Sequence, residues 1–165
     1  MNFIQQVRGL FAPEGSSATA SSRSAGTVEK IHRSDEEWRA QLTPEQFKVL
    51  RAKGTERPFS CDTRIASGPA ATQQAGVYKC AGCDLELFEA STKFDSGTGW
   101  PSFWKPIEGH IETETDRSLG VTRTEVLCAR CDGHLGHVFE DGPAPTGLRY
   151  CMNGVALKFE PRQAA

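Results

Sequence analysis

The sequence predicts a mainly β domain of short antiparallel strands, with two short helices at its front. Sixteen glycines and nine prolines in 165 residues leave little room for long helices. From residue 76 onward, short segments of alternating apolar and polar residues are separated by turn-forming residues. Ahead of them lie two helix starts with complete capping signals. A chain of this length can form one such domain with its own core.

The two helices are expected between residues 34 and 54. Ser34 followed by Glu37 forms a capping box, and Thr43 followed by Gln46 repeats it. Each cap contributes on the order of 1 kcal/mol. Their apolar faces are made of residues three or four apart: Trp38, Leu42, Phe47 and Leu50. We expect these helices to dock on the β domain.

Five segments are the candidate strands: residues 76–80, 85–88, 122–127, 137–139 and 155–159. In the last and clearest one, Val155, Leu157 and Phe159 would share one side, opposite Ala156 and Lys158. Glycine-containing turns at residues 96–99, 132–133 and 141–143 separate the segments.

The first 33 residues are expected to be a flexible tail, and residues 34–165 to be the folded domain. Residues 12–28 are mostly Ser, Ala, Thr and Gly, as in a linker. Residues 1–11 resemble no signal peptide; they are a loose terminus or a short amphipathic turn. No run of 18 apolar residues exists, and the net charge of −2 favours neither nucleic acid nor membrane. We therefore expect a cytoplasmic monomer without nucleic-acid or membrane partners.

Four of the six cysteines form two matching Cys-x-x-Cys pairs, Cys80 with Cys83 and Cys128 with Cys131. Four thiolates close a tetrahedral zinc site, so we predict one structural zinc ion per chain. The 44 residues between the pairs must leave the metal and return to it. Thioredoxin-like redox motifs are the alternative, but neither pair opens a predicted helix; simply buried thiols are a third possibility.

The remaining cysteines are Cys61 and Cys151. On an extended strand Arg149, Cys151 and Asn153 would point to the same face. A guanidinium beside a thiol favours the thiolate, which is the nucleophilic form. Taken alone, a cysteine in a strand is more often a small buried apolar residue.

Two histidines, His134 and His137, follow the second cysteine pair. Histidine is the usual general acid near neutral pH. Zinc ligation is the least favoured interpretation because four cysteines already satisfy the metal. By sequence alone, structural and catalytic roles remain about equally open.

The aromatic residues Trp100 and Phe103 follow a glycine turn. Aromatic rings attract thioethers and methyl groups on sulfur, so this segment is a candidate substrate contact. Core packing is the alternative and is favoured for Phe103, whereas Trp100 is the better candidate to meet a ligand.

Several of these motifs, in this order, resemble the type B methionine-R-sulfoxide reductases. The matching stretches are residues 54–59, 93–103, 134–139, 141–143 and 147–153, together with both Cys-x-x-Cys pairs. The resemblance covers roughly residues 34–160. It implies two antiparallel sheets, a zinc ion away from the active site, and reduction of the R epimer of methionine sulfoxide, free or within proteins.

By position the resemblance also implies site roles. Cys151 matches the nucleophile, Arg149 a residue that supports its thiolate, and Trp100 the residue packed on the substrate methyl group, with Phe103 nearby. The residues that match those holding and protonating the sulfoxide are His134, His137 and Asn153.

One position departs from the family pattern, since Thr98 stands where many members carry a recycling cysteine. Cys61 begins a Gly-, Ala-, Ser- and Thr-rich loop and becomes the candidate resolving residue. The expected cycle takes Cys151 to a sulfenic acid, then to a disulfide with Cys61, which thioredoxin reduces. In the alternative, Cys61 is a bystander and an external thiol reduces the sulfenic acid. The rival functions are a non-enzymatic zinc module and another thiol enzyme, such as a peroxidase or disulfide reductase.

Overall fold

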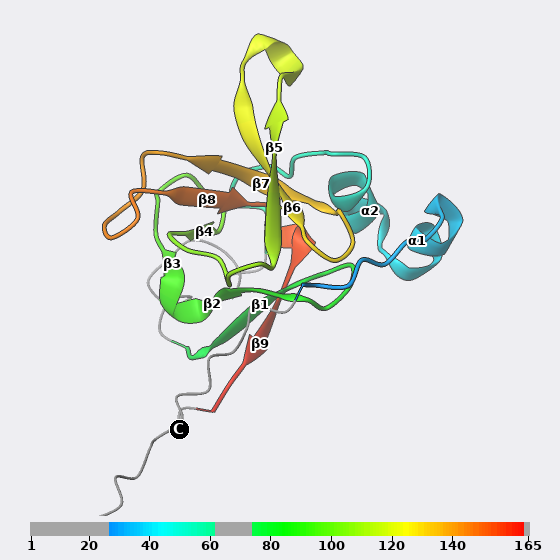
Figure 1. The fold of residues 1–165 in the computed structure, drawn as a ribbon, viewed down its shortest axis with the longest axis horizontal. Coiled ribbons are helices and arrows are strands. Elements are labelled where there is room, and N and C mark those ends of the chain that lie inside the picture. The colour runs from blue at the N-terminus through cyan, green and yellow to red at the C-terminus, as the bar shows by residue number, and fades with distance from the viewer. Residues whose placement is uncertain (1–26, 62–73, 164–165) are drawn as a thin grey trace, which may run out of the picture.

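The computed structural model describes residues 27–61 and 74–163 and confirms the predicted fold class (Figure 1). The helices and strands are α1 Asp35–Gln41, α2 Pro44–Leu50, β1 Gly76–Cys80, β2 Glu86–Glu89, β3 Lys93–Phe94, β4 Ser102–Phe103, β5 Ile111–Asp116, β6 Arg123–Cys128, β7 His134–Phe139, β8 Arg149–Met152 and β9 Leu157–Pro161. The described residues also form the short 3₁₀ turns η2 Ala90–Thr92, η3 Ser118–Gly120 and η4 Gly154–Ala156.

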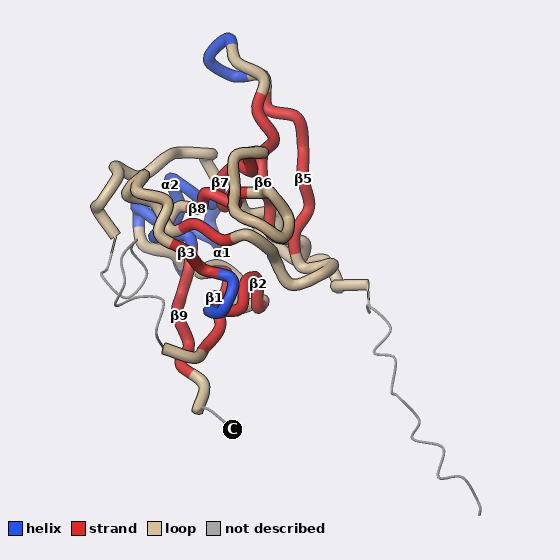
Figure 2. Tube along the Cα trace, turned by 90° about the vertical axis from the view of Figure 1, so that its left-hand side faces the viewer, coloured by secondary structure: helices blue, strands red, loops and turns tan. Residues whose placement is uncertain are grey.

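The strands form two antiparallel sheets. The smaller has the order β2-β1-β9, and the larger has the order β3-β4-β8-β7-β6-β5. The β5–β6 hairpin extends beyond the body of the molecule in both views (Figures 1 and 2). The strand that carries Cys151, β8, therefore lies inside the larger sheet, with β4 on one side and β7 on the other.

Both predicted helices are present, and both capping boxes are formed. The Ser34 hydroxyl accepts the N–H of Glu37, whose carboxylate accepts the N–H of Ser34, and Thr43 and Gln46 repeat this reciprocal pair. The helices dock as expected. The predicted apolar residues are all buried, and Val49 joins them: Trp38, Leu42, Phe47, Val49 and Leu50.

Most predicted strands appear within one to three residues of their expected limits, and β1 matches at both ends. The long strand β5 was not predicted. Its sequence alternates charged residues with threonine, and four of its six residues are exposed, so it has no apolar face to reveal it. The two-residue strands β3 and β4 are too short to show any period.

The expected strand at 155–159 is wrong at its beginning. Residues 154–156 form η4, and β9 starts only at Leu157. Ala156, which was expected opposite the apolar side, is fully buried. The reason is long-range: the Glu56 carboxylate accepts the backbone N–H groups of Gly154 and Val155 and holds them in a turn.

The core lies between the sheets and under the helices. The Phe103 ring stacks on Phe88 with ring centroids 4.3 Å apart, and Tyr78 meets its edge at 5.0 Å. Strands β7 and β8 approach closely at Gly136, where an added Cβ would lie 2.1 Å from the Cys151 carbonyl oxygen. Only glycine fits there.

Residues 28–33, ahead of the domain start expected at residue 34, contact the domain. The Ile31 N–H donates to the Arg130 carbonyl, and Lys30 pairs with Glu112 and Asp132. The expected tail at residues 1–26 and most of the loop expected after Cys61 (62–73) lie outside the described residues. Within the described part of the chain, no helix has the length and apolar content that crossing a bilayer requires.

Candidate active site and metal centre

Cys151 lies between two neighbours in the larger sheet. It is directly opposite Ser102 of β4 and His137 of β7. Residues opposite each other in antiparallel strands project to the same face, so the thiol and the His137 imidazole share one side of the sheet. Tyr150 and Met152 alternate to the other side and are buried in the core. The sheet thus presents Cys151 beside a histidine.

This face opens into a cleft of about 190 Å³. It is lined by Thr55, Trp100, Arg123, Gly136, His137, Phe139, Cys151, Met152 and Asn153. Four residues singled out from the sequence therefore meet in one place: Trp100, His137, Cys151 and Asn153. They come from loops and strands up to 53 residues apart, Trp100 to Asn153.

Burial raises the pKa of the Cys151 thiol above its ordinary value of 9.0. The positive charge of Arg149 and hydrogen bonds from Thr98 and Arg149 act in the opposite direction. The sequence-based expectation that Arg149 favours the thiolate therefore has the correct sign for that one contact. It does not decide the net shift, because withdrawal of the thiol from water outweighs it.

Arg149 is held in place from two sides. Its guanidinium makes a bidentate pair with Asp141, at 2.9 and 3.0 Å, and lies 4.5 Å from the centre of the Phe139 ring. This pairing raises the pKa of Arg149 further. The guanidinium is thus a fixed positive charge beside Cys151.

His134 is buried and does not line the cleft. Its Nδ1 lies 2.7 Å from Oε1 of Glu125, and Lys53 pairs with the other carboxylate oxygen at 2.8 Å. Burial lowers the pKa of His134, although Glu125 opposes this. Burial raises the pKa of Glu125, but hydrogen bonds from Lys53 and His134 outweigh it and leave that pKa below its ordinary value. His134 is therefore a neutral imidazole beside the ionised carboxylate of Glu125.

The tautomer of His134 follows from its partner. The Glu125 carboxylate can only accept, so the proton of neutral His134 is on Nδ1 and Nε2 carries a lone pair. Among the described residues, no group forms a hydrogen bond with this buried Nε2. The ring lies 5.4 Å from that of His137, centroid to centroid.

His137 has a different partner, at the far end of strand β5. Its Nε2 lies 2.8 Å from Oδ2 of Asp116, and Arg123 pairs with the same oxygen at 2.9 Å. The N–H and hydroxyl of Ser118 and the contact with His137 hold the pKa of Asp116 well below its usual range. The projecting hairpin therefore supplies an ionised carboxylate to a cleft histidine, a role that the sequence pattern does not reveal.

Glu56 contacts two cleft residues through its backbone. Its carbonyl accepts Nε1–H of Trp100 at 3.2 Å, and its N–H donates to Oδ1 of Asn153 at 3.0 Å. The Asn153 amide also donates to the Leu135 carbonyl at 3.0 Å. Glu56 was not among the predicted site residues, although it lies in one of the stretches (54–59) that carry the family resemblance.

Phe103 is not brought to the cleft. It lies opposite Tyr150 on the core face of β4 and has no exposed surface. Side chains alternate along a strand, so Ser102 takes the face of Cys151 and Phe103 the other. The expected substrate contact is replaced by core packing, the alternative that was favoured for this residue.

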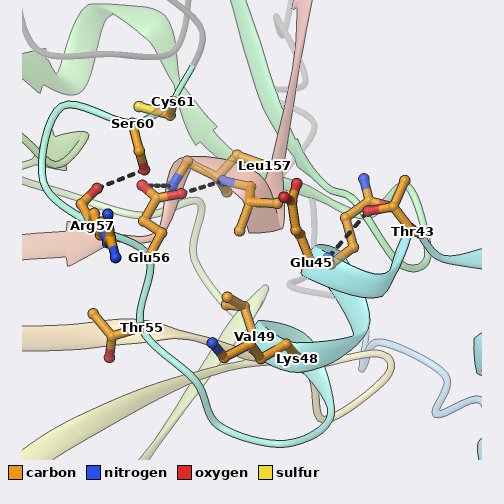
Figure 3. A pocket seen from close by; sticks show the side chains of 13 residues that line it. Thr43, Glu45, Lys48, Val49, Thr55, Glu56, Arg57, Ser60, Cys61 and Leu157 are labelled. Atoms are coloured by element: carbon orange, nitrogen blue, oxygen red, sulfur yellow. Dashed lines mark hydrogen bonds between the residues drawn. The ribbon is translucent and has the colours of Figure 1, made fainter.

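Cys61 lines a separate, larger pocket of about 520 Å³, shown in Figure 3. Its Sγ lies 2.7 Å from the place where a Cβ on Gly154 would be, so Cys61 packs against the residue three positions after Cys151. Thr55 lines both pockets. The two candidate redox cysteines thus line different pockets that share Thr55.

The other four cysteines come together as predicted. Their sulfur atoms all lie within 4.8 Å of one another, with 3.7 Å between Cys80 and Cys131 and 3.5 Å between Cys83 and Cys128. Zinc–thiolate bonds of about 2.3 Å in a tetrahedron place sulfur atoms about 3.8 Å apart. A disulfide would need about 2.05 Å. Four thiolates at this spacing fit a zinc ion.

The two halves of this centre have the same backbone form. In each, the residue after the second cysteine, Asp84 or Asp132, has a positive φ and donates its N–H to the carbonyl of the first cysteine at 2.9 Å. The helices cover the centre, since Trp38 and Leu50 would contact a Cβ at Gly82 at 3.5 and 3.6 Å. These cysteines would join the two sheets, because Cys80 belongs to β1 and Cys128 to β6.

Comparison with known proteins agrees with this geometry. The SelR domain model matches residues 42–161. A peptide methionine sulfoxide reductase MsrB of Bradyrhizobium diazoefficiens is 56% identical over 137 residues, which are 82% of this chain and 94% of that protein. Proteins of the same name from Pseudomonas putida (strain W619) and Agrobacterium fabrum are 57% and 52% identical, over 84% and 82% of this chain and 100% and 96% of their own lengths. The chain therefore belongs to the type B methionine-(R)-sulfoxide reductase family.

Proposed function

We propose that this protein reduces the R epimer of methionine sulfoxide, in proteins, in peptides or free, with Cys151 as the nucleophile. The observation that carries the proposal is the placement of Cys151 opposite His137 in a cleft that Trp100 also lines. Family membership supports the same substrate, since the relatives are named peptide methionine sulfoxide reductases.

The chemistry is an oxygen transfer between two sulfur atoms. The Cys151 thiolate attacks the electrophilic sulfur of the sulfoxide. In the net transfer a bond forms between Cys151 Sγ and the oxygen, the sulfur–oxygen bond of the substrate breaks, and methionine leaves as the thioether. The oxygen stays on Cys151 as a sulfenic acid, so the cysteine is oxidised by two electrons and the substrate is reduced by two. A histidine gives one proton to the oxygen, and the Cys151 thiol returns one proton to that histidine, so the number of protons is conserved. Thiol and sulfoxide thus become sulfenic acid and thioether.

His137 is the proposed proton donor. It lines the cleft beside Cys151, and the Asp116 carboxylate orients its ring. His134 is less suited to this task, because it is buried and does not line the cleft. Its Nε2 is buried, so His134 would act by positioning the neighbouring His137, whose ring centroid lies 5.4 Å from its own. The two histidines would then have complementary roles.

Trp100 and Asn153 hold the substrate in this proposal. The half-buried indole of Trp100 offers an aromatic surface for the S-methyl group, and this contact selects the epimer. The Asn153 amide uses one N–H for the Leu135 carbonyl and retains a second for the substrate. Arg149 and Thr98 stabilise the thiolate as it forms.

Cys61 is the proposed resolving residue. Its thiol condenses with the Cys151 sulfenic acid to give a disulfide and water, and thioredoxin, through its dithiol, then reduces this disulfide by exchange. Packing of Cys61 against Gly154 supports the assignment, because that contact is three residues from Cys151. Since the two cysteines line different pockets, residues 55–61 must shift before the sulfur atoms can bond.

The four-cysteine centre would hold one structural zinc ion through Cys80, Cys83, Cys128 and Cys131. A closed set of four thiolates leaves no open position for substrate, so the ion would contribute to stability.

The test is turnover of a peptide carrying each sulfoxide epimer, with thioredoxin as reductant. Cys151→Ser should abolish reduction of the R epimer while the chain still binds zinc. Cys61→Ser should complete one turnover and then stop. Reduction of the S epimer in preference to the R epimer, or full activity of Cys151→Ser, would refute the proposed function. Normal thioredoxin-driven cycling by Cys61→Ser would refute only the resolving role.

A further inference from the structure

We propose that Glu56 is a positioning residue that holds Trp100 and Asn153 in place on the substrate side of the cleft. The proposal rests on the proposed function of those two residues. Glu56 itself does not line the Cys151 cleft, so its effect would pass through the groups that it contacts.

The Glu56 carboxylate attaches its own segment to η4. Its two oxygens accept the N–H groups of Gly154 and Val155 at 2.6 and 2.9 Å. In Figure 3, dashed lines that start at the labelled Glu56 carboxylate mark these hydrogen bonds. These are the first N–H groups of a 3₁₀ turn, which have no partner within the turn and favour a negative charge nearby. No side-chain hydrogen bond comes from the N-cap residue of this turn, Asn153. The carboxylate of Glu56 therefore takes the place of a local cap, from 98 residues away in sequence.

The backbone of the same residue then contacts both substrate-side groups. The carbonyl of Glu56 accepts the indole N–H of Trp100, and its N–H donates to the side-chain oxygen of Asn153. Residues 53–57 belong to no helix or strand, so no regular hydrogen-bonding pattern fixes this backbone. Its position relative to η4 depends on side-chain contacts, and the carboxylate makes two short ones, at 2.6 and 2.9 Å.

Removing the carboxylate should therefore displace the 55–57 segment and loosen both substrate-side groups together. A displacement of about 1 Å in a positioning group can cost a reaction on the order of a hundredfold in rate. The thiol itself should be unaffected, because its contacts with Arg149 and Thr98 do not involve Glu56.

The test compares Glu56→Ala and Glu56→Gln with a matched control, Glu45→Ala. Glu45 is an exposed acidic residue that lines the same pocket as Glu56. Each variant, purified with zinc, is mixed in excess with a peptide containing methionine-(R)-sulfoxide without reductant. The single-turnover rate and its dependence on protein concentration are measured, together with the rate of Cys151 alkylation by iodoacetamide and the melting temperature. The alkylation rate is measured in a Cys61→Ser background.

Glu56→Ala should lose about 10- to 100-fold in the maximal single-turnover rate. Glu56→Gln, which keeps one oxygen acceptor, should recover part of that loss, and Glu45→Ala should match the wild type. Alkylation of Cys151 should proceed at the wild-type rate in all three variants. A purely structural role would instead lower the melting temperature and leave the single-turnover rate of the folded protein unchanged.

The proposal is overturned if Glu56→Ala turns over like the wild type, or if its alkylation slows as much as its turnover. If Glu56→Ala does not fold, Glu56→Gln decides the question. Its side chain offers one oxygen acceptor to two N–H groups, so a wild-type single-turnover rate in this variant would also overturn the proposal. Absence of R-epimer turnover in the wild type would refute the proposed function itself, so the two failures can be distinguished.

Discussion

The carboxylate of Asp116, at the end of strand β5, lies 2.8 Å from Nε2 of His137 in strand β7. These strands are not neighbours, because β6 lies between them. The Asp116 carboxylate therefore reaches across β6 and places a negative charge next to His137, the histidine beside Cys151. Arg123, on the same oxygen, keeps that charge in position.

Asp116→Asn should slow the single-turnover reduction of methionine-(R)-sulfoxide by about tenfold or more, since an oriented general acid contributes 10²- to 10⁴-fold. The neutral amide would leave the His137 ring less firmly held and would no longer place a negative charge beside this proton donor. Glu114→Gln, an exposed change on the same strand, is the control and should have no effect. Equal rates for Asp116→Asn and the control would contradict the role of Asp116.

Iodoacetamide alkylation of Cys151 in the resting protein should rise with pH to a midpoint above 9.0, because burial raises the pKa of this thiol. Arg149 favours the thiolate, as expected from the sequence, but burial outweighs it, so we expect thiolate formation to accompany substrate binding. Arg149→Met should move the midpoint still higher, since it removes the positive charge. A Cys61→Ser background isolates the signal, and a midpoint near 7 would refute this prediction.

Thr98→Cys should restore thioredoxin-driven cycling to a protein whose Cys61 is replaced by serine. The Thr98 hydroxyl already hydrogen-bonds the Cys151 thiol, so a sulfur atom at this position would be within reach of the sulfenic acid. Thr98→Ser is the control and should leave the Cys61→Ser protein unable to cycle. The measurement is thioredoxin-coupled turnover of the R epimer, and no gain with Thr98→Cys would count against proximity.

Chelation should remove one metal ion per chain and lower the stability of the fold, and it should leave the rate of the chemical step unchanged. In small zinc peptides such binding is worth about 10–16 kcal/mol, and here the four cysteines would join the two sheets. Metal content, melting temperature and single-turnover rate are measured on the same samples. The fraction of protein that stays folded should react at the wild-type rate during the first turnover. A rate that falls in proportion to the metal, with the fold intact, would contradict a structural role.

Acidification should destabilise the protein through His134 and Glu125. The folded pKa of His134 is below its ordinary 6.5, so the unfolded chain takes up a proton first and stability falls as the pH drops below 6.5. The folded pKa of Glu125 is below 4.5, so its contribution is present above 4.5 and is lost as the pH falls through the folded value. Urea unfolding at pH 7, 5.5 and 4 measures this. Glu125→Gln should cost about 1–3 kcal/mol at pH 7 and flatten the acid limb below pH 4.5.

The sequence by itself determined the parts of this protein whose signals are local or directly chemical. Capping boxes lie within four residues, so α1 and α2 could be located from their caps and apolar spacing. The paired Cys-x-x-Cys motifs predicted which four cysteines come together as a candidate metal centre, because paired thiolates at that spacing suit a metal ion. The face shared by Arg149 and Cys151 followed from strand alternation alone, and the long motifs carried the family resemblance.

Only the tertiary structure decided which distant side chains serve those residues. Asp116 and Glu125 become histidine partners because β5, β6 and β7 lie side by side, and no sequence period records such a pairing. Glu56 caps a turn 98 residues away and moves the start of β9, an effect invisible to any local window. The net shift of the Cys151 pKa also required the fold, because it is a balance between loss of water and the charges and hydrogen bonds around the thiol. The depth of burial is a property of the assembled sheets.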